Sequence, residues 1–96
     1  MSMKGKKVLV RTYSAGVHYG TLESKVGKEV ILTDSKRIWY WEGANSISQL
    51  AVEGTRKPEN CKFSMAVPRI ILTESIEIIE TTKLAQDSIE SLQWKE

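Results

Sequence analysis

The stretch RIWYWEGANS, residues 37–46, joins a predicted β-strand to a predicted helix. Its first half is rich in aromatic and β-branched residues, which is typical of a strand. Its last residue, Ser46, stands three positions before Gln49, the spacing at which a hydroxyl and an amide together cap the start of a helix. The chain therefore changes here from strands to a helix, and we expect an α+β fold.

Upstream of this stretch, the sequence reads as strands joined by short turns. β-Branched and aromatic residues recur over 7–13, 17–23, 29–33 and 37–41, as they do in strands. Glycine and polar residues separate these segments, and the last of the predicted turns falls at 34–36. Four such strands predict an N-terminal antiparallel β-meander or half-barrel.

Downstream, we expect a short middle helix, further core strands and a C-terminal amphipathic helix. The middle helix runs from the cap at Ser46 to Gly54, a residue type that commonly ends helices. The most apolar runs, 69–72 and 75–80, predict central strands of the core. No linker divides the chain, so residues 1–96 are predicted to form a single domain.

The C-terminal helix is predicted to begin at Thr82, which can cap it. Its apolar face is expected to consist of Leu84, Ala85, Ile89 and Leu92. Trp94, near the end of the chain, is expected to pack on another part of the molecule, since it would otherwise form an exposed apolar patch.

Composition argues against several classes of protein. No apolar run approaches the ~20 residues that span a membrane, and the basic N-terminus lacks the apolar segment of a secretory signal. Cys61 is the only cysteine and His18 the only histidine, so neither an intramolecular disulfide nor a structural zinc site is expected. These features predict a cytoplasmic protein with no membrane partner and no cofactor.

The net charge of +2 hides an uneven distribution. Residues 1–37 carry eight lysines and arginines against three acids, whereas residues 72–96 carry two against six. Such a polar molecule can attract anions on one side and pair with copies of itself, although solvation of two surfaces is the alternative. A chain of 96 residues also buries a modest core, which favours a homo-oligomer.

The sequence offers little support for catalysis. His18 lies in a predicted strand, where a lone histidine is more often a surface or interface residue than a base. The serines, threonines and the cysteine stand in no nucleophile motif, and no P-loop or glycine-rich phosphate motif occurs. We therefore do not expect an enzyme.

The aromatic stretch offers a better case for ligand binding. In a strand, Arg37, Trp39 and Trp41 face one side, while Ile38 and Tyr40 face the other. If the two tryptophans face outward, they form a platform on which a nucleotide base can stack. If they face inward, they belong to the core or to an oligomer interface. Both arrangements are compatible with the sequence.

The remaining candidates surround this stretch. Arginine makes bidentate contacts to phosphate, and a helix start offers N–H groups to an anion, although capping alone explains the same residues. The predicted ligand-binding residues are Arg11, Tyr13, Lys36, Arg37, Trp39, Trp41, Asn45 and Ser46.

Three strings carry a resemblance that covers nearly the whole chain: RTYSAGVHYG at 11–20, RIWYWEGA at 37–44 and ILTESIEII at 71–79. They resemble a family of small phage and prophage proteins. The size and mixed build are also similar to those of phage counter-defence proteins such as the Thoeris anti-defence sponges, which sequester cyclic ADP-ribose signals without cleaving them. This second resemblance implies a function but identifies no ligand residue.

Together, these observations predict a phage-encoded, non-enzymatic binding protein that sequesters a small anionic nucleotide-type ligand. One alternative is a protein that inhibits a host defence complex by direct contact. Another is a small β-barrel that binds single-stranded nucleic acid, although a net charge of +2 is low for a partner that needs a continuous basic track.

Overall fold

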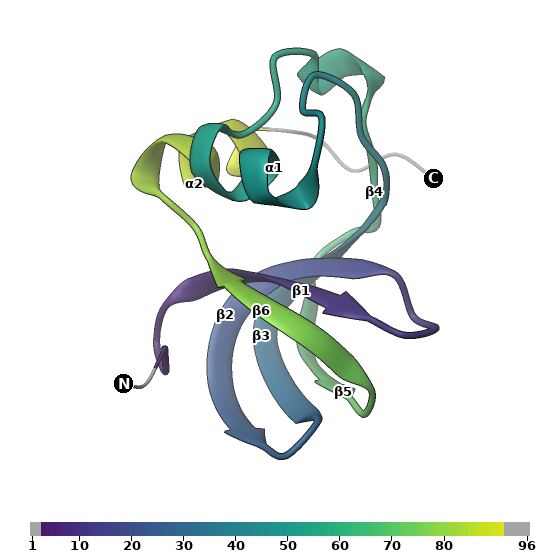
Figure 1. Cartoon of the computed structure of the whole chain (residues 1–96), viewed down its shortest axis with the longest axis vertical. Coiled ribbons are helices and arrows are strands. Elements are labelled where there is room, and N and C mark those ends of the chain that lie inside the picture. Colours follow the sequence, from purple (N-terminus) through teal and green to yellow (C-terminus); the bar gives the residue numbers. More distant parts are fainter. Residues whose placement is uncertain (1–2, 92–96) are drawn as a thin grey trace.

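The computed structural model describes residues 3–91 of the chain. Two helices lie side by side and cover one side of a strongly bent antiparallel sheet (Figure 1). The predicted α+β class is confirmed, with one helix in the middle of the chain and one near its C-terminal end. In chain order, the elements are β1 (Lys7–Thr12), β2 (Val17–Val26), β3 (Glu29–Tyr40), α1 (Ile47–Glu53), the 3-10 turn η1 (Pro58–Asn60), β4 (Lys62–Phe63), β5 (Val67–Leu72), β6 (Ser75–Glu80) and α2 (Lys83–Glu90).

The sheet curls into a partly closed barrel. Its strands follow the order β4-β3-β2-β1-β6, and β5 lies beside β4 along the same edge of the long strand β3. At the start of β6, the backbone N–H of Ser75 donates to the carbonyl oxygen of Lys28 in the β2–β3 turn, with 3.1 Å between N and O. This hydrogen bond links β6 to the β2–β3 turn. The N-terminal strands β1, β2 and β3 pair in chain order and antiparallel, which is the meander of the predicted meander or half-barrel.

The sheet separates two apolar cores. The inner core, inside the barrel, consists of Val8, Val10, Leu22, Val30, Leu32 and Leu72. The outer core, under the helices, consists of Leu9, Tyr19, Ile38, Leu50, Ala51, Cys61, Phe63 and Ile89. Because side chains alternate along a strand, β1 contributes to both cores and is buried on both faces.

The predicted turn at 34–36 is wrong, because β3 runs unbroken from Glu29 to Tyr40. A β-bulge takes the place of the turn: Asp34 has a φ of 48°, and the pairing with β2 shifts by one residue here. Gly20 lies opposite, where a Cβ would come within 3.2 Å of Cα of Ser35. The bulge inserts one residue, so the inward-facing positions of β3 change from even-numbered to odd-numbered.

The two most apolar runs do not form central strands, contrary to the expectation for 69–72 and 75–80. β5 and β6 lie at edges of the sheet, and Ile71 and Ile76 are 53% and 50% exposed. Hydrophobicity alone does not separate a central strand from an edge strand with an apolar outer face.

Both predicted helix starts are confirmed. The Oγ of Ser46 accepts a hydrogen bond from the N–H of Gln49 at 3.1 Å, and the Oγ1 of Thr82 accepts one from the N–H of Ala85, also at 3.1 Å. Gly54 ends α1 with a φ of 74°, a conformation that favours glycine.

The expected apolar face of α2 is only partly buried. Ala85 and Ile89 are buried, whereas Leu84 is 64% exposed. Leu92 and Trp94 lie outside the described residues. None of the helices between residues 3 and 91 has the length and apolar character that a membrane span requires.

Candidate ligand-binding site

One end of the barrel interior is lined by polar side chains. His18 of β2 lies opposite Arg37 of β3, and Ser35 lies two residues before Arg37, on the same face of that strand. On its other side, His18 lies opposite Val10 of β1, a member of the inner core. The apolar interior therefore ends at His18 and Ser35, which are each only 1% exposed.

A hollow of about 180 Å³ opens beside these polar groups, and we call it the barrel-end hollow. It is smaller than the roughly 300–1,000 Å³ of a site for a whole drug-sized ligand, so it suits one ring of a larger molecule. It is formed where β2, β3 and the start of β5 meet the residue that follows β4. Its walls are His18, Ser35, Arg37, Trp39, Ser64, Val67 and Ile70.

Two residues that line this hollow each carry a buried polar atom with no hydrogen-bond partner among the described residues: Nδ1 of His18 and Oγ of Ser35. The other ring nitrogen of His18, Nε2, lies 2.9 Å from the carbonyl oxygen of Ala15. Because a carbonyl oxygen only accepts, Nε2 carries the hydrogen and Nδ1 keeps a lone pair. An unpaired buried polar atom costs roughly 1–3 kcal/mol, so native structures hold few of them, and each one calls for an explanation.

The surroundings of His18 keep its ring neutral. Burial lowers the pKa of His18 most, the hydrogen bond to Ala15 opposes this effect, and the positive charge of Arg37 lowers the pKa further. The net shift is downward from the ordinary value near 6.5. At neutral pH, Nδ1 is therefore a hydrogen-bond acceptor.

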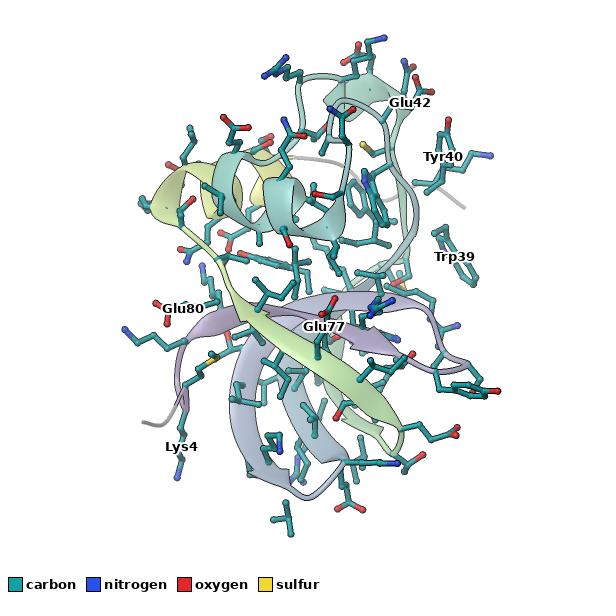
Figure 2. The ribbon with its side chains drawn as sticks, viewed as in Figure 1. Lys4, Trp39, Tyr40, Glu42, Glu77 and Glu80 are labelled. Carbon is teal, nitrogen blue, oxygen red and sulfur yellow. The ribbon has the colours of Figure 1, made fainter. Side chains whose placement is uncertain are left out.

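Arg37 and Trp39 form the rim of the hollow. The Cζ atom of Arg37 lies 5.2 Å from the centroid of the Trp39 ring, within the range of a cation–π contact. Trp39 is 55% exposed and points away from the ribbon (Figure 2). The backbone of Arg37 is fixed by Ser64, whose Oγ accepts from the Arg37 N–H at 2.8 Å and whose N–H donates to the Arg37 carbonyl at 2.9 Å.

The charge of Arg37 is available to a ligand. Within residues 3–91, its guanidinium is in ion-pair contact with no carboxylate. By contrast, Arg11 is held by Glu77 at 3.0 Å and Arg69 by Glu23 at 2.7 Å.

The alternation expected for the three consecutive aromatics breaks at Tyr40. Ile38 is buried and Trp39 is exposed, as alternation requires, but a register shift in the pairing with β4 separates Ile38 from Tyr40. Tyr40 is 49% exposed, and its hydroxyl donates to Glu42 at 3.0 Å. Trp41 packs against the outer core, so it does not extend the face of Trp39.

The other predicted cations do not join Arg37. Lys36 faces the opposite side of β3, where it lines a separate hollow with Tyr19 and Glu90. The carboxylate of Glu90 is already neutralised there by Lys7, at 2.6 Å. Arg11, with its glutamate partner, projects from the face of β1 that does not carry the inner core.

The remaining predicted residues also lie away from the hollow. Tyr13 follows β1 and is 79% exposed. Asn45 and Ser46 cap α1, because the N–H of Asn45 donates to the side-chain oxygen of Gln49 at 2.8 Å and Ser46 accepts from its backbone. Of the eight predicted residues, the structure brings Arg37 and Trp39 together at the barrel-end hollow.

Neither of the two residues that carry an unpartnered polar atom was predicted from the sequence. The expectation that His18 is a surface or interface residue is wrong, since it is 1% exposed. A signal was present, because His18, Gly20 and Leu22 alternate along β2 and share its inner face. Ser35 gave no such signal, because the bulge at Asp34 decides which way it faces.

A larger hollow, of about 830 Å³, lies between the β2–β3 hairpin, the N-terminal segment and β6. Its acids Glu23 and Glu77 are held by arginines, and Lys25 and Lys28 on its wall are exposed to solvent. The two buried, unpartnered atoms of the described chain lie elsewhere, in the barrel-end hollow. The polar groups of its lining residues therefore favour the barrel-end hollow as the binding site, although its volume is smaller.

The fold and the hollow define a small α+β domain whose partly closed barrel ends in a polar recess. Within residues 3–91, no three His, Cys, Asp or Glu side chains gather to hold a metal ion. The chain belongs to the family described as a domain of unknown function, DUF6948, whose model matches residues 5–89. A comparison with curated proteins finds no match. The family match includes every residue that lines the barrel-end hollow.

Proposed function

We propose that this protein is a non-enzymatic binding protein that sequesters a small anionic nucleotide-type ligand at the barrel-end hollow. The observation that carries the proposal is an exposed tryptophan and an arginine, placed beside two buried polar atoms, where neither the arginine has a carboxylate partner nor the two atoms a hydrogen-bond partner within residues 3–91. Stacking of a base on Trp39 is worth about 1–3 kcal/mol. Arg37 can bind a phosphate through two parallel hydrogen bonds.

A small ligand fits the charge distribution better than a nucleic-acid strand. A strand needs cations along a continuous track, but Lys36 and Arg37 face opposite sides of β3. Arg11 and Arg69 are occupied by glutamates. One arginine at a small hollow suits one or two phosphates.

The resemblance to phage proteins supplies a biological setting for this proposal. In the cytoplasm of an infected host, a phage-encoded protein of this kind would hold a nucleotide signal intact and so lower its free concentration. Such a counter-defence sponge needs tight binding and no chemical step.

A second candidate function is inhibition of a host defence protein by direct contact. It is favoured by the exposed large side chains of Trp39, Tyr40 and Met65, which are 55%, 49% and 54% exposed. Aromatic and methionine side chains are enriched at protein interfaces. Capture of a defined host protein by the wild type but not by the Tyr40→Ala variant, with no nucleotide bound, would favour this second function.

We also propose that the protein acts as a homo-oligomer. In the described chain, β5 and β6 each pair along one side only, and they carry the half-exposed Ile71 and Ile76. Edge strands with apolar side chains are templates for pairing with another chain. A native mass spectrum showing only monomer at micromolar concentration would exclude this part of the proposal.

The ligand proposal is tested by mixing the protein with a panel of nucleotides: nucleoside mono- and diphosphates, dinucleotides, ADP-ribose and cyclic ADP-ribose. We expect at least one member to raise the melting temperature, because a ligand that binds only the folded state stabilises it. Heat denaturation should then release that ligand with its mass unchanged.

Two neighbouring aromatics provide a matched control. Trp39 and Tyr40 are similarly exposed, at 55% and 49%, but only Trp39 lines the hollow. Trp39→Ala should remove the thermal shift, whereas Tyr40→Ala should keep it. An absence of any shift across the panel, or an equal loss in both variants, contradicts the proposal.

A further inference from the structure

The hydrogen-bonding character of the barrel-end hollow differs between its interior and its rim. Inside, Nδ1 of His18 can only accept, because the ring hydrogen is on Nε2, which lies against the carbonyl oxygen of Ala15 at 2.9 Å. At the rim, the guanidinium of Arg37 can only donate. The hydroxyl of Ser35, also inside, can do either. A ligand that pairs with all three groups must place a hydrogen-bond donor inside the hollow and an acceptor at its rim.

We infer that the ligand inserts an N–H group that donates to Nδ1 of His18, while its anionic group stays outside on Arg37. This inference rests on the proposed function and specifies the chemistry of the ligand. The molecule is a heterocycle with a ring or exocyclic N–H, joined to a phosphate or another anion. Inorganic phosphate does not meet this requirement, because it has neither a ring nor an N–H group.

The walls of the hollow agree with a flat heterocycle. Val67 and Ile70 are apolar, and Trp39 presents an aromatic ring, so together they suit the faces of a planar group. Ser35 can pair with a second polar atom on the edge of that group, next to the one that meets His18. Both buried atoms then gain the partner that the described residues do not provide.

Two amide substitutions of His18 separate binding from folding. In His18→Gln, the longer side chain places its amide where Nε2 was, so it keeps the hydrogen bond to Ala15 and loses the acceptor at Nδ1. In His18→Asn, the shorter side chain keeps an acceptor near Nδ1 and loses the bond to Ala15. We expect His18→Gln to fold as well as the wild type and to bind about tenfold to a hundredfold more weakly. We expect His18→Asn to melt earlier and to keep most of its affinity.

If His18 had only a structural role, affinity would follow stability, and His18→Gln would bind the ligand more tightly than His18→Asn. Stronger binding by His18→Gln than by His18→Asn therefore overturns the inference. Retained affinity in both variants overturns it as well, since an ordered water would then suffice for Nδ1.

The donor on the ligand is tested with named probe pairs in titration calorimetry. Adenosine monophosphate is compared with its N6,N6-dimethyl analogue, inosine monophosphate with its N1-methyl analogue, and both pairs with ribose 5-phosphate. We expect a parent nucleotide to bind at least about tenfold more tightly than its methylated analogue, and ribose 5-phosphate not to bind measurably.

The outcomes distinguish this inference from the function on which it rests. If a parent and its analogue bind equally, the N–H inference is wrong while nucleotide binding stands. If none of the five probes binds to the wild type and the wider nucleotide panel also gives no thermal shift, the proposed function is wrong and the inference falls with it. If another nucleotide of the panel binds but none of these five probes does, the inference that a purine N–H donates to His18 is wrong.

Discussion

Replacing Ser35 by alanine is expected to make the ligand-free protein more stable, although the residue is only 1% exposed. Its Oγ has no partner in the described chain, so the folded state carries the desolvation cost of an unpaired hydroxyl, roughly 1–3 kcal/mol. Alanine removes that oxygen and leaves a void on the order of 20 Å³, which costs about 0.5 kcal/mol at ~24 cal/mol per Å³. The balance is a gain of about 0.5–2.5 kcal/mol.

Ser64→Ala is the matched control, because Ser64 lines the same hollow but is fully engaged. Its Oγ accepts from the backbone of Arg37 at 2.8 Å and donates to the carbonyl of Met65 at 3.0 Å. Losing these bonds should lower the free energy of unfolding by about 1 kcal/mol. Urea and thermal denaturation of ligand-free protein measure both variants. A change of 1 kcal/mol moves the melting temperature by ~4–8 °C in a domain of this size.

The two variants should therefore move in opposite directions. If Ser35→Ala lowers the free energy of unfolding as much as Ser64→Ala does, the Oγ of Ser35 has a partner in solution and the reasoning about the hollow is refuted. In the presence of a ligand that fills the hollow, the gain from Ser35→Ala should shrink, because the wild-type hydroxyl is then satisfied.

The remaining predictions concern pH and packing. The folded state lowers the pKa of His18, so the unfolded state binds more protons below pH ~6.5. The free energy of unfolding should therefore fall from neutral pH to about pH 5.5, by at most ~1.4 kcal/mol per pH unit. The same measurement on His18→Gln should lack this contribution. Leu9→Ala should cost about 2–5 kcal/mol in urea denaturation, because Leu9 is 0% exposed in the outer core, and a cost below ~1 kcal/mol would contradict the packing. Gly43→Ala should destabilise the protein by several °C in a thermal melt, because Gly43 has a φ of 85° and an added Cβ would lie 2.5 Å from the backbone nitrogens of Arg56 and Lys57; an unchanged melt would contradict this geometry.

The fold class could be predicted because its signals are local. The caps at Ser46 and Thr82 depend on a hydroxyl and a backbone N–H three residues away, and the strand pattern of β1 and β2 is visible in their composition. The position of a strand within the sheet depends on pairings between distant residues. For that reason, the apolar runs around Ile71 and Ile76 were expected at the centre of the sheet and lie at its edges.

The site could be predicted only in part, for a related reason. Arg37 and Trp39 share a face because they are two residues apart in one strand. Trp41 does not join them, because the pairing with β4 shifts register before Tyr40 and the strand ends at Tyr40. Ser35 enters the site through the bulge at the preceding residue, and such a bulge depends on the partner strand as much as on its own sequence.

The most direct test of the hollow as a binding site is a nitrogen NMR spectrum of the imidazole ring in tag-free protein. His18 is the only histidine, so its two ring nitrogens are assigned without ambiguity. At neutral pH without ligand, we predict a protonated Nε2 and a bare Nδ1. Addition of the nucleotide that gives the largest thermal shift should move the Nδ1 signal to the position of a hydrogen-bonded acceptor and leave Nε2 protonated. An Nδ1 signal that stays unchanged at saturating ligand, or that is already protonated in the free protein, would contradict the central claim.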